Sequence, residues 1–133
     1  MKVIAIDDEP IALSIVQEFC QRLGDIELQT FTDPNIGMEA VKKVKPELLL
    51  LDIRLGTANG IELARQLQAS TSIVFTTAYT EFALDGFEVG AIDYLHKPFS
   101  FDRFKSIHKR CRPPITRRTQ LCGLYQTTEG GLI

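Results

Sequence analysis

The sequence predicts an α/β fold in which a parallel sheet lies between two layers of helices. Short apolar segments alternate five times with segments whose apolar residues recur at helical spacing. The most apolar segment, residues 48–51, is a run of four leucines that suits a strand buried on both faces. This alternation implies βαβ units with right-handed crossovers and therefore a parallel sheet.

The composition is that of one globular domain of 133 residues, with 44% hydrophobic and 24% charged residues. Fifteen basic and seventeen acidic residues give a formal charge of −2, which argues against nucleic-acid contact by this segment. No apolar run approaches the length that spans a membrane. The first segment turns acidic at Asp7, too early for a signal peptide.

The three cysteines, Cys20, Cys111 and Cys122, are odd in number and lie in no metal-ligand spacing. They fit a reducing cytoplasm. His96 and His108 have no sequence neighbours that suggest a metal site, so both are expected at the surface.

The first two strands and the first helix follow from simple signals. Residues 3–6 form an apolar strand that runs into three acidic residues. Pro10 suits the first turn of a helix over residues 11–23, because its missing N–H has no partner there. Ala12, Val16, Phe19 and Leu23 lie on one face of that helix, and Gly24 ends it. Residues 26–31 form the second strand, with a weaker pattern.

The middle of the chain contains the central strand. Asp33 and Pro34 signal the start of a helix over residues 36–44. The strand of leucines should end at Asp52, where a polar side chain first meets water. Residues 56–60 form a turn-rich loop. The helix that follows turns three residues inward: Ile61, Ala64 and Leu67.

The last third contains two more strands. Residues 72–77 are β-branched and apolar and form the fourth strand. Residues 81–89 form a short helix, and residues 90–95 form the fifth strand before His96, Lys97 and Pro98. The last helix buries four residues: Phe101, Phe104, Ile107 and Cys111. Residues 113–133 lack periodicity and are interpreted as a linker whose attached domain is absent or as a cloning remnant.

Polar residues follow four of these strands: Asp7, Asp8, Asp52, Thr77 and Lys97. The carboxyl ends of parallel strands meet at one edge of the sheet, so these side chains should converge there. Three carboxylates in one place repel one another and raise their pKa values unless a cation joins them. Lys97 supplies one positive charge, and Mg²⁺ would supply the rest.

These residue types favour phosphoryl transfer over hydride or acyl transfer. A carboxylate can act as the nucleophile and become an aspartyl phosphate. Mg²⁺, an ammonium and a hydroxyl can then compensate the charge on the transferred oxygens.

From residue 1 to about residue 112, the sequence resembles the receiver domain of bacterial two-component response regulators. The resemblance implies a flavodoxin-like, three-layer (βα)5 fold with strand order 2-1-3-4-5. It also implies that Asp52 accepts a phosphoryl group from a histidine kinase. Asp7, Asp8, Asp52 and the backbone carbonyl of Arg54 would hold Mg²⁺, with Asp8 the more direct ligand of the first pair.

Three further motifs match the same family. Thr77 matches the switch hydroxyl, and Ala78 the small residue beside the phosphate. Tyr94 matches the aromatic residue that rotates on activation. Lys97 and Pro98 match the phosphate-binding lysine with its usually cis peptide. One departure is Gly56, which replaces a common proline or methionine and is expected to loosen its loop.

Residues 75–84 and 90–95 resemble receivers that precede a LytTR-type DNA-binding domain (the LytR/AlgR family). This resemblance implies a cytoplasmic transcription regulator whose output domain is absent from this chain. It also implies a homodimer formed through residues 81–89, the fifth strand and the last helix. Because such a domain is consumed as a substrate, it is not a conventional enzyme.

Other interpretations remain open for single residues and for the whole site. Asp7 and Asp8 taken alone suit the start of a helix, and Thr77 alone suits a strand. A haloacid-dehalogenase-like phosphatase also uses an aspartyl nucleophile, although its Asp-x-Asp motif is absent after the first strand. A receiver that never takes phosphate is a third interpretation. A dinucleotide-binding domain is disfavoured, because no G-x-G-x-x-G motif follows a strand.

Overall fold

The computed structural model describes residues 1–67, 71–78 and 90–111. It contains the predicted parallel sheet, in the order β2-β1-β3-β6-β7, which confirms the expected strand order 2-1-3-4-5. The five strands are β1 (Lys2–Ile6), β2 (Glu27–Phe31), β3 (Leu48–Asp52), β6 (Ser72–Thr77) and β7 (Asp93–His96). The helix expected at residues 81–89, the segment 113–133 and Cys122 lie outside the described residues.

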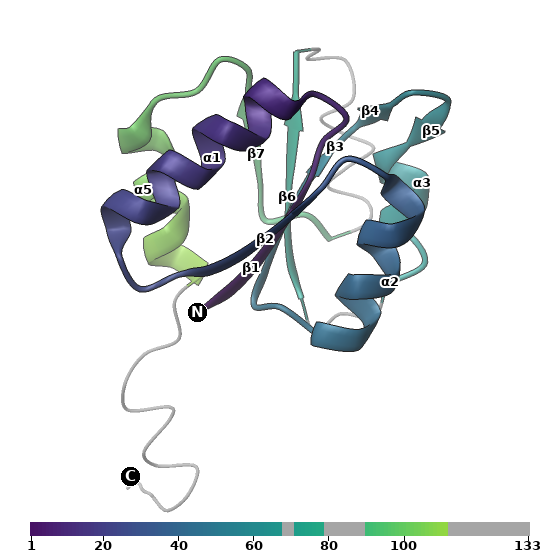
Figure 1. Ribbon diagram of the computed structural model, residues 1–133, viewed down its shortest axis with the longest axis horizontal. Coiled ribbons are helices and arrows are strands. Elements are labelled where there is room, and N and C mark those ends of the chain that lie inside the picture. Colours follow the sequence, from purple (N-terminus) through teal and green to yellow (C-terminus); the bar gives the residue numbers. More distant parts are fainter. Residues whose placement is uncertain (68–70, 79–89, 112–133) are drawn as a thin grey trace, which may run out of the picture.

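Helices cover both faces of the sheet, so the three-layer prediction is confirmed. The described helices are α1 (Pro10–Leu23), α2 (Pro34–Val44), α3 (Gly60–Ala64) and α5 (Phe101–Cys111). Helices α1 and α5 lie on one face of the sheet, and α2 and α3 lie on the other (Figure 1). No helix in the described part of the chain is long and apolar enough to cross a membrane.

Strand β3 occupies the centre of the sheet, and all five of its residues are buried. Its side chains alternate between the two cores. Leu49 and Leu51 pack in the cluster beneath α2 and α3, whereas Leu48 and Leu50 pack in the cluster beneath α1 and α5. This two-sided burial explains the unbroken run of leucines.

The buried face of α1 differs in part from the predicted face. Val16 and Phe19 are buried as expected, but Leu13 and Cys20 complete the buried set. Ala12 and Leu23, which were expected on this face, are only half-buried. The four buried residues stand at positions i, i+3, i+6 and i+7 from Leu13, so they form one stripe along the helix.

The expected surface position of His108 is wrong. Its side chain is buried on α5, and its Nε2 atom lies 3.2 Å from Asp25 Oδ1 in the loop between α1 and β2. His108 lies four residues after Phe104 and next to Ile107, both of which are buried. The helical period therefore turns it inward. The other histidine, His96, is exposed as expected.

The turn-rich loop after β3 is more ordered than predicted. Strands β4 (Arg54–Leu55) and β5 (Ala58–Asn59) pair antiparallel to form a small hairpin. Asn59 then caps α3, because its side-chain oxygen accepts hydrogen bonds from the next helical N–H groups. The hairpin brings the start of α3 back against the end of β3.

Gly60 makes the closest approach in this region. A Cβ atom built on Gly60 would lie 2.2 Å from the backbone carbonyl oxygen of Asp52, and the Gly60 N–H donates to the carbonyl of Ile53 at 2.6 Å. The absence of a side chain at position 60 therefore allows α3 to pack directly on the strand end that carries Asp52.

We expect Gly60→Ala to lower the free energy of unfolding by about 1–3 kcal/mol, because backbone atoms must move to relieve the clash. An alanine in an unobstructed helix would instead stabilise the fold by up to about 1 kcal/mol. Urea unfolding of the wild type and the variant shows whether the substitution lowers or raises the free energy of unfolding. A more stable variant would show that the contact with Asp52 is not close.

Candidate functional site

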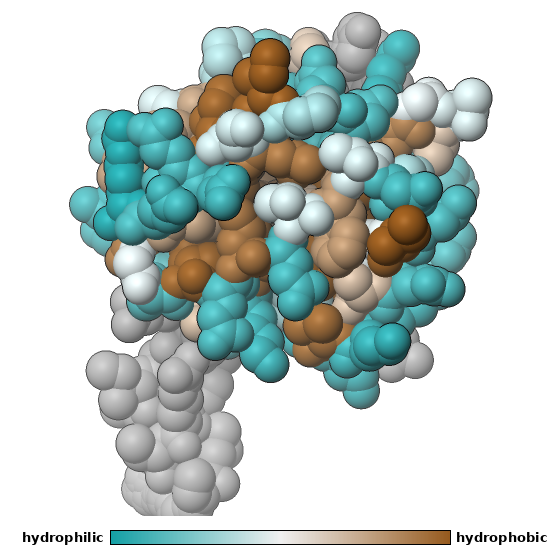
Figure 2. All heavy atoms as spheres, viewed as in Figure 1, coloured by the Kyte–Doolittle hydropathy of each residue, from teal (hydrophilic) through white to brown (hydrophobic). Residues whose placement is uncertain are grey.

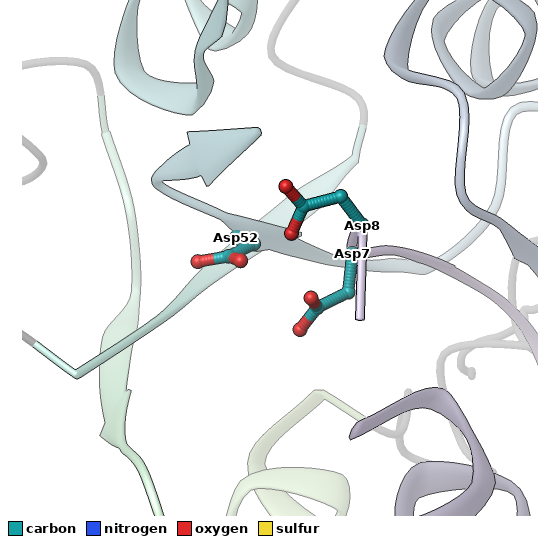
Figure 3. Close-up of side chains that lie close together, drawn as sticks. All are labelled: Asp7, Asp8 and Asp52. Atoms are coloured by element: carbon teal, nitrogen blue, oxygen red, sulfur yellow. The ribbon is translucent and has the colours of Figure 1, made fainter. Parts of the chain in front are cut away.

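Three carboxylates gather at the carboxyl edge of the sheet (Figure 3). Asp7 and Asp8 follow β1, Asp52 ends the neighbouring strand β3, and one oxygen of each lies within 4.8 Å of the others. Asp7 and Asp52 are each only 5% exposed, whereas Asp8 is exposed. The parallel pairing of β1 with β3 produces this arrangement, because it aligns the ends of the two strands.

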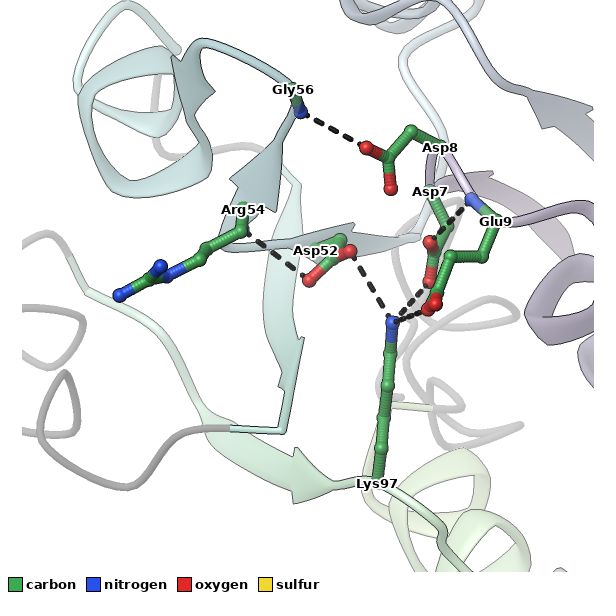
Figure 4. Close-up of polar contacts among 7 residues, drawn as sticks. All are labelled: Asp7, Asp8, Glu9, Asp52, Arg54, Gly56 and Lys97. Carbon is green, nitrogen blue, oxygen red and sulfur yellow. Dashed lines mark hydrogen bonds and ion pairs between the residues drawn. The ribbon is translucent and has the colours of Figure 1, made fainter.

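Lys97 completes the cluster from the other side. It directly follows β7, and its N–H donates to the carbonyl of Thr77 at 2.8 Å, which extends the pairing of β6 with β7. Its Nζ atom lies 2.8 Å from Asp7 Oδ2, 3.1 Å from Glu9 Oε1 and 3.3 Å from Asp52 Oδ2 (Figure 4). The peptide bond between Lys97 and Pro98 is cis, as the resemblance implies.

The electrostatics of the cluster are dominated by the buried carboxylates. Burial, followed by the charge of Asp7, raises the pKa of Asp52 to about 7, although Lys97 opposes the shift. Burial disfavours the charge of Lys97, yet its contacts with Asp7, Asp52 and Glu9 hold its pKa above the usual value. One ammonium therefore serves more carboxylates than it can neutralise, and the site retains a net negative charge.

The remaining predicted site residues lie around this cluster. Thr77 is buried at the end of β6, next along the sheet from Asp52. Ala78 follows it, is exposed, and lines the same cavity as Lys97. Tyr94 lies outside the cluster of charges. Its ring is half-buried in β7 and packs against Phe75, with ring centres 5.6 Å apart.

Arg54 and Gly56 contribute backbone groups from the hairpin. The Arg54 N–H donates to Asp52 Oδ1 at 3.4 Å, and the guanidinium points away from the carboxylates (Figure 4). The Gly56 N–H donates to Asp8 Oδ2 at 3.0 Å. A proline at position 56 could not make this contact, because proline has no N–H. The loosening expected from Gly56 stays a prediction.

Sequence reasoning missed the part played by Glu9. It was noted as a residue at the end of the first strand but was not assigned to the site. The structure places its carboxylate on Lys97, beside Asp7. Its position directly after Asp7 and Asp8 was a signal, but a side chain 66% exposed to solvent is more often a simple surface charge.

A cavity of about 640 Å³ opens beside the cluster. Its charged end is formed by Asp8, Glu9 and Lys97, and most of the remaining lining is apolar. That apolar wall includes Ile11, which is 78% exposed, and Ile15 on the first turns of α1. Hydrophobic side chains gather over this end of α1 on the molecular surface (Figure 2).

The donor set fits a hard divalent cation. All three clustered side chains offer carboxylate oxygens, which Mg²⁺ prefers, and Asp8 faces solvent where a partly hydrated ion could enter. Burial and the charge of Asp7 raise the pKa of Asp52, and Lys97 only partly offsets them. A divalent ion here would lower that pKa.

Residues 3–109 match the family model for the response regulator receiver domain. The chain belongs to this family. The match covers both ends of the site, from the strand that precedes Asp7 to the helix that follows Lys97. The family resemblance expected from the sequence motifs is therefore confirmed.

Curated relatives agree with this assignment. The chain is 33% identical to the sensory transduction protein LytT of Bacillus anthracis over 97% of this chain and 56% of the relative. It is 34% identical to the positive alginate biosynthesis regulatory protein of Pseudomonas aeruginosa over 98% of this chain and 54% of the relative. These relatives confirm the expected likeness to the LytR/AlgR group, and the receiver chain spans about half of their length.

A solved receiver structure shares the fold. The response regulator TrrA of Thermotoga maritima, solved in complex with Mg²⁺ and beryllium fluoride, has a TM-score of 0.74 and 26% identity. The alignment covers 84% of this receiver and 98% of that chain. The flavodoxin-like fold class is thus supported by the strand order and by a solved relative.

Proposed function

We propose that Asp52 of this receiver accepts a phosphoryl group from a histidine kinase and that its phosphorylation controls an output domain. One observation carries the proposal. The Asp52 carboxylate lies beside a pair of acidic side chains that suit a metal ion and within 3.3 Å of an ammonium that suits phosphate. The regulators that match this chain are about twice as long, which leaves room for a DNA-binding output domain.

In the proposed reaction, an oxygen of Asp52 attacks the phosphorus of a phosphohistidine. The phosphorus–nitrogen bond breaks, and its electron pair returns to the imidazole. Bound Mg²⁺, held by Asp7, Asp8, Asp52 and the Arg54 carbonyl, would keep Asp52 ionised and neutralise charge on the phosphoryl oxygens. Lys97 would move its contact from Asp52 to a phosphoryl oxygen.

Two further residues would lie against the phosphoryl group on Asp52. The Thr77 hydroxyl would donate to a phosphoryl oxygen from the neighbouring strand end, and the small side chain of Ala78 would leave room beside it. The cavity beside Asp52 supports a protein donor, because an apolar wall that includes Ile11 and Ile15 can hold a partner's surface next to the charged centre.

We further propose that the signal passes from Thr77 to Tyr94. As Thr77 moves toward the phosphoryl group, the Tyr94 ring would turn inward, and strand β7 with α5 would shift between two arrangements. Asp93, beside Tyr94, supports this link. Although burial alone would raise its pKa, hydrogen bonds from Arg103, the Tyr94 N–H and Arg110 lower it. A change in β7 would therefore reach α5, which is expected to form the homodimer surface.

We expect Tyr94→Ala to keep phosphorylation of Asp52 but to weaken phosphorylation-dependent dimerisation about fivefold or more, a typical coupling between two sites. Analytical ultracentrifugation with Mg²⁺ and beryllofluoride measures the dimer. His96→Ala is the control, because it changes an exposed residue of the same strand. Full dimerisation by Tyr94→Ala would remove Tyr94 from the mechanism.

The proposal also divides the chain. Residues 1–112 would form the receiver, and residues 113–133 would be a linker to the output domain or a cloning remnant. The receiver would be consumed as a phosphate acceptor and would not turn over a substrate. A cytoplasmic location suits this partner and agrees with the free thiols of Cys20 and Cys111.

Labelling with acetyl phosphate and Mg²⁺ tests the proposed function. Intact-mass measurement should show the addition of one phosphoryl group to the wild type and none to Asp52→Asn. Removal of the metal with a chelator should also prevent labelling. Labelled Asp52→Asn would place the acceptor elsewhere, and an unlabelled wild type would favour an interaction module that takes no phosphate. Turnover of phosphate esters would favour the phosphatase alternative.

A further inference from the structure

The ammonium of Lys97 has no spare hydrogen-bond donor in this structure. An ammonium has three N–H groups, and Lys97 Nζ contacts three carboxylates among the described residues. Two of them, Asp7 and Asp52, belong to the proposed metal and phosphate site. The third, Glu9, has no part in the reaction described above.

The position of Glu9 at the start of α1 does not explain why a glutamate stands there. Glu9 occupies the N-cap of α1, where serine, threonine, aspartate and asparagine are preferred, and its side chain caps no N–H of the described first turn. Its backbone is fixed separately, because its N–H donates to Asp7 Oδ1 at 3.0 Å. The side chain is therefore held over the cluster, where it reaches Lys97.

We propose that Glu9 competes with the phosphoryl group for Lys97 and thereby limits phosphorylation of Asp52. This inference rests on the proposed function. A phosphoryl oxygen would take over the Lys97 N–H that contacts Asp52, while the Glu9 carboxylate holds the same ammonium at 3.1 Å. The carboxylate of Glu9 also adds a negative charge to those of Asp7, Asp8 and Asp52 at the place that the phosphoryl oxygens must approach.

Lys97 should keep its position when the charge of Glu9 is removed. Asp7 and Asp52 still contact the ammonium at 2.8 and 3.3 Å, so Lys97 does not depend on Glu9 for its position. Glu9→Gln should therefore favour binding of a phosphoryl group. The effect is modest, about two- to fivefold, because Glu9 is mostly exposed and its charge is screened by solvent.

Titration with beryllofluoride at saturating Mg²⁺ tests this proposal, because beryllofluoride occupies the place of a phosphoryl group. Binding is followed by NMR at low salt for the wild type, Glu9→Gln and Glu18→Gln. Glu18 is a matched control, since it lies on the same helix, is 60% exposed and pairs with Arg22 away from the site. We expect half-saturation at about two- to fivefold lower beryllofluoride for Glu9→Gln only. Added salt should narrow the difference.

A second measurement needs neither metal nor phosphate. The NMR signals of the Lys97 side chain should change in Glu9→Gln and stay unchanged in Glu18→Gln. If the wild type binds beryllofluoride but Glu9→Gln binds it equally or less tightly, the competition is refuted and the proposed function stands. If neither the wild type nor the variants bind, the proposed function itself fails.

Discussion

Replacing Lys97 with methionine is expected to lower the free energy of unfolding by about 2–4 kcal/mol at pH 7. The substitution removes the only ammonium that the described residues bring to this cluster. Asp7 and Asp52 would then remain buried next to each other without a cation. The expected loss lies below the largest values for buried pairs, because Lys97 retains 17% exposure and water can reach the site.

Urea unfolding of the wild type and Lys97→Met measures this loss. Lys105→Met is the control, since it removes the same charge from an exposed position on α5. Addition of Mg²⁺ should stabilise Lys97→Met more than the wild type, because a divalent ion can replace the missing positive charge. Equal stability of Lys97→Met and Lys105→Met would contradict the account of the cluster.

Replacing Asp52 with asparagine is expected to stabilise the metal-free domain at pH 8 by up to about 4 kcal/mol. The pKa of Asp52 rises from the ordinary 3.8 to about 7 on folding, mainly because of burial and the charge of Asp7. The folded state therefore binds this proton more tightly than the unfolded state. The stability that comes from binding this proton is fully present below pH 4 and is lost as the pH rises to about 7.

The difference in the free energy of unfolding between Asp52→Asn and the wild type should consequently shrink as the pH is lowered from 8 to 5. Thermal or urea unfolding across this range, with a chelator present, gives the two curves. Asp33→Asn is the control, because Asp33 is an exposed N-cap and asparagine caps a helix equally well. A wild type more stable than Asp52→Asn at pH 8 would show that Lys97 overcomes the repulsion from Asp7.

Much of the fold was predictable because each strand is short, apolar and buried. The run of leucines predicted the position of β3, and the β-branched and apolar residues 72–77 predicted the position of β6. The hairpin of β4 and β5 was missed, since two-residue strands show no periodicity. His108 was misplaced because it was judged as a single polar residue, although the spacing from Phe104 pointed to the buried face.

The convergence of the candidate site was predictable for a different reason. In a parallel sheet, the carboxyl ends of the strands meet at one edge, so Asp7 and Asp52 come together at the ends of the neighbouring strands β1 and β3. Lys97 reaches them from the end of β7, on the far side of β6 from β3. The contact of Glu9 with Lys97 depends on the rotamer of a long side chain. The contact of the Gly56 N–H with Asp8 uses a backbone group that every residue except proline has. The position of Glu9 directly after Asp7 and Asp8 is the one sequence signal for the first contact, and the second contact leaves none.

The central claim is that Asp52 itself takes the phosphoryl group. Borohydride reduction of the phosphorylated receiver converts an acyl phosphate into an alcohol, so a phosphorylated aspartate becomes homoserine. Peptide mapping by mass spectrometry after treatment with acetyl phosphate and Mg²⁺ should find homoserine at position 52. Homoserine at position 7 or 8, or at no position, would contradict the assignment of Asp52 as the acceptor.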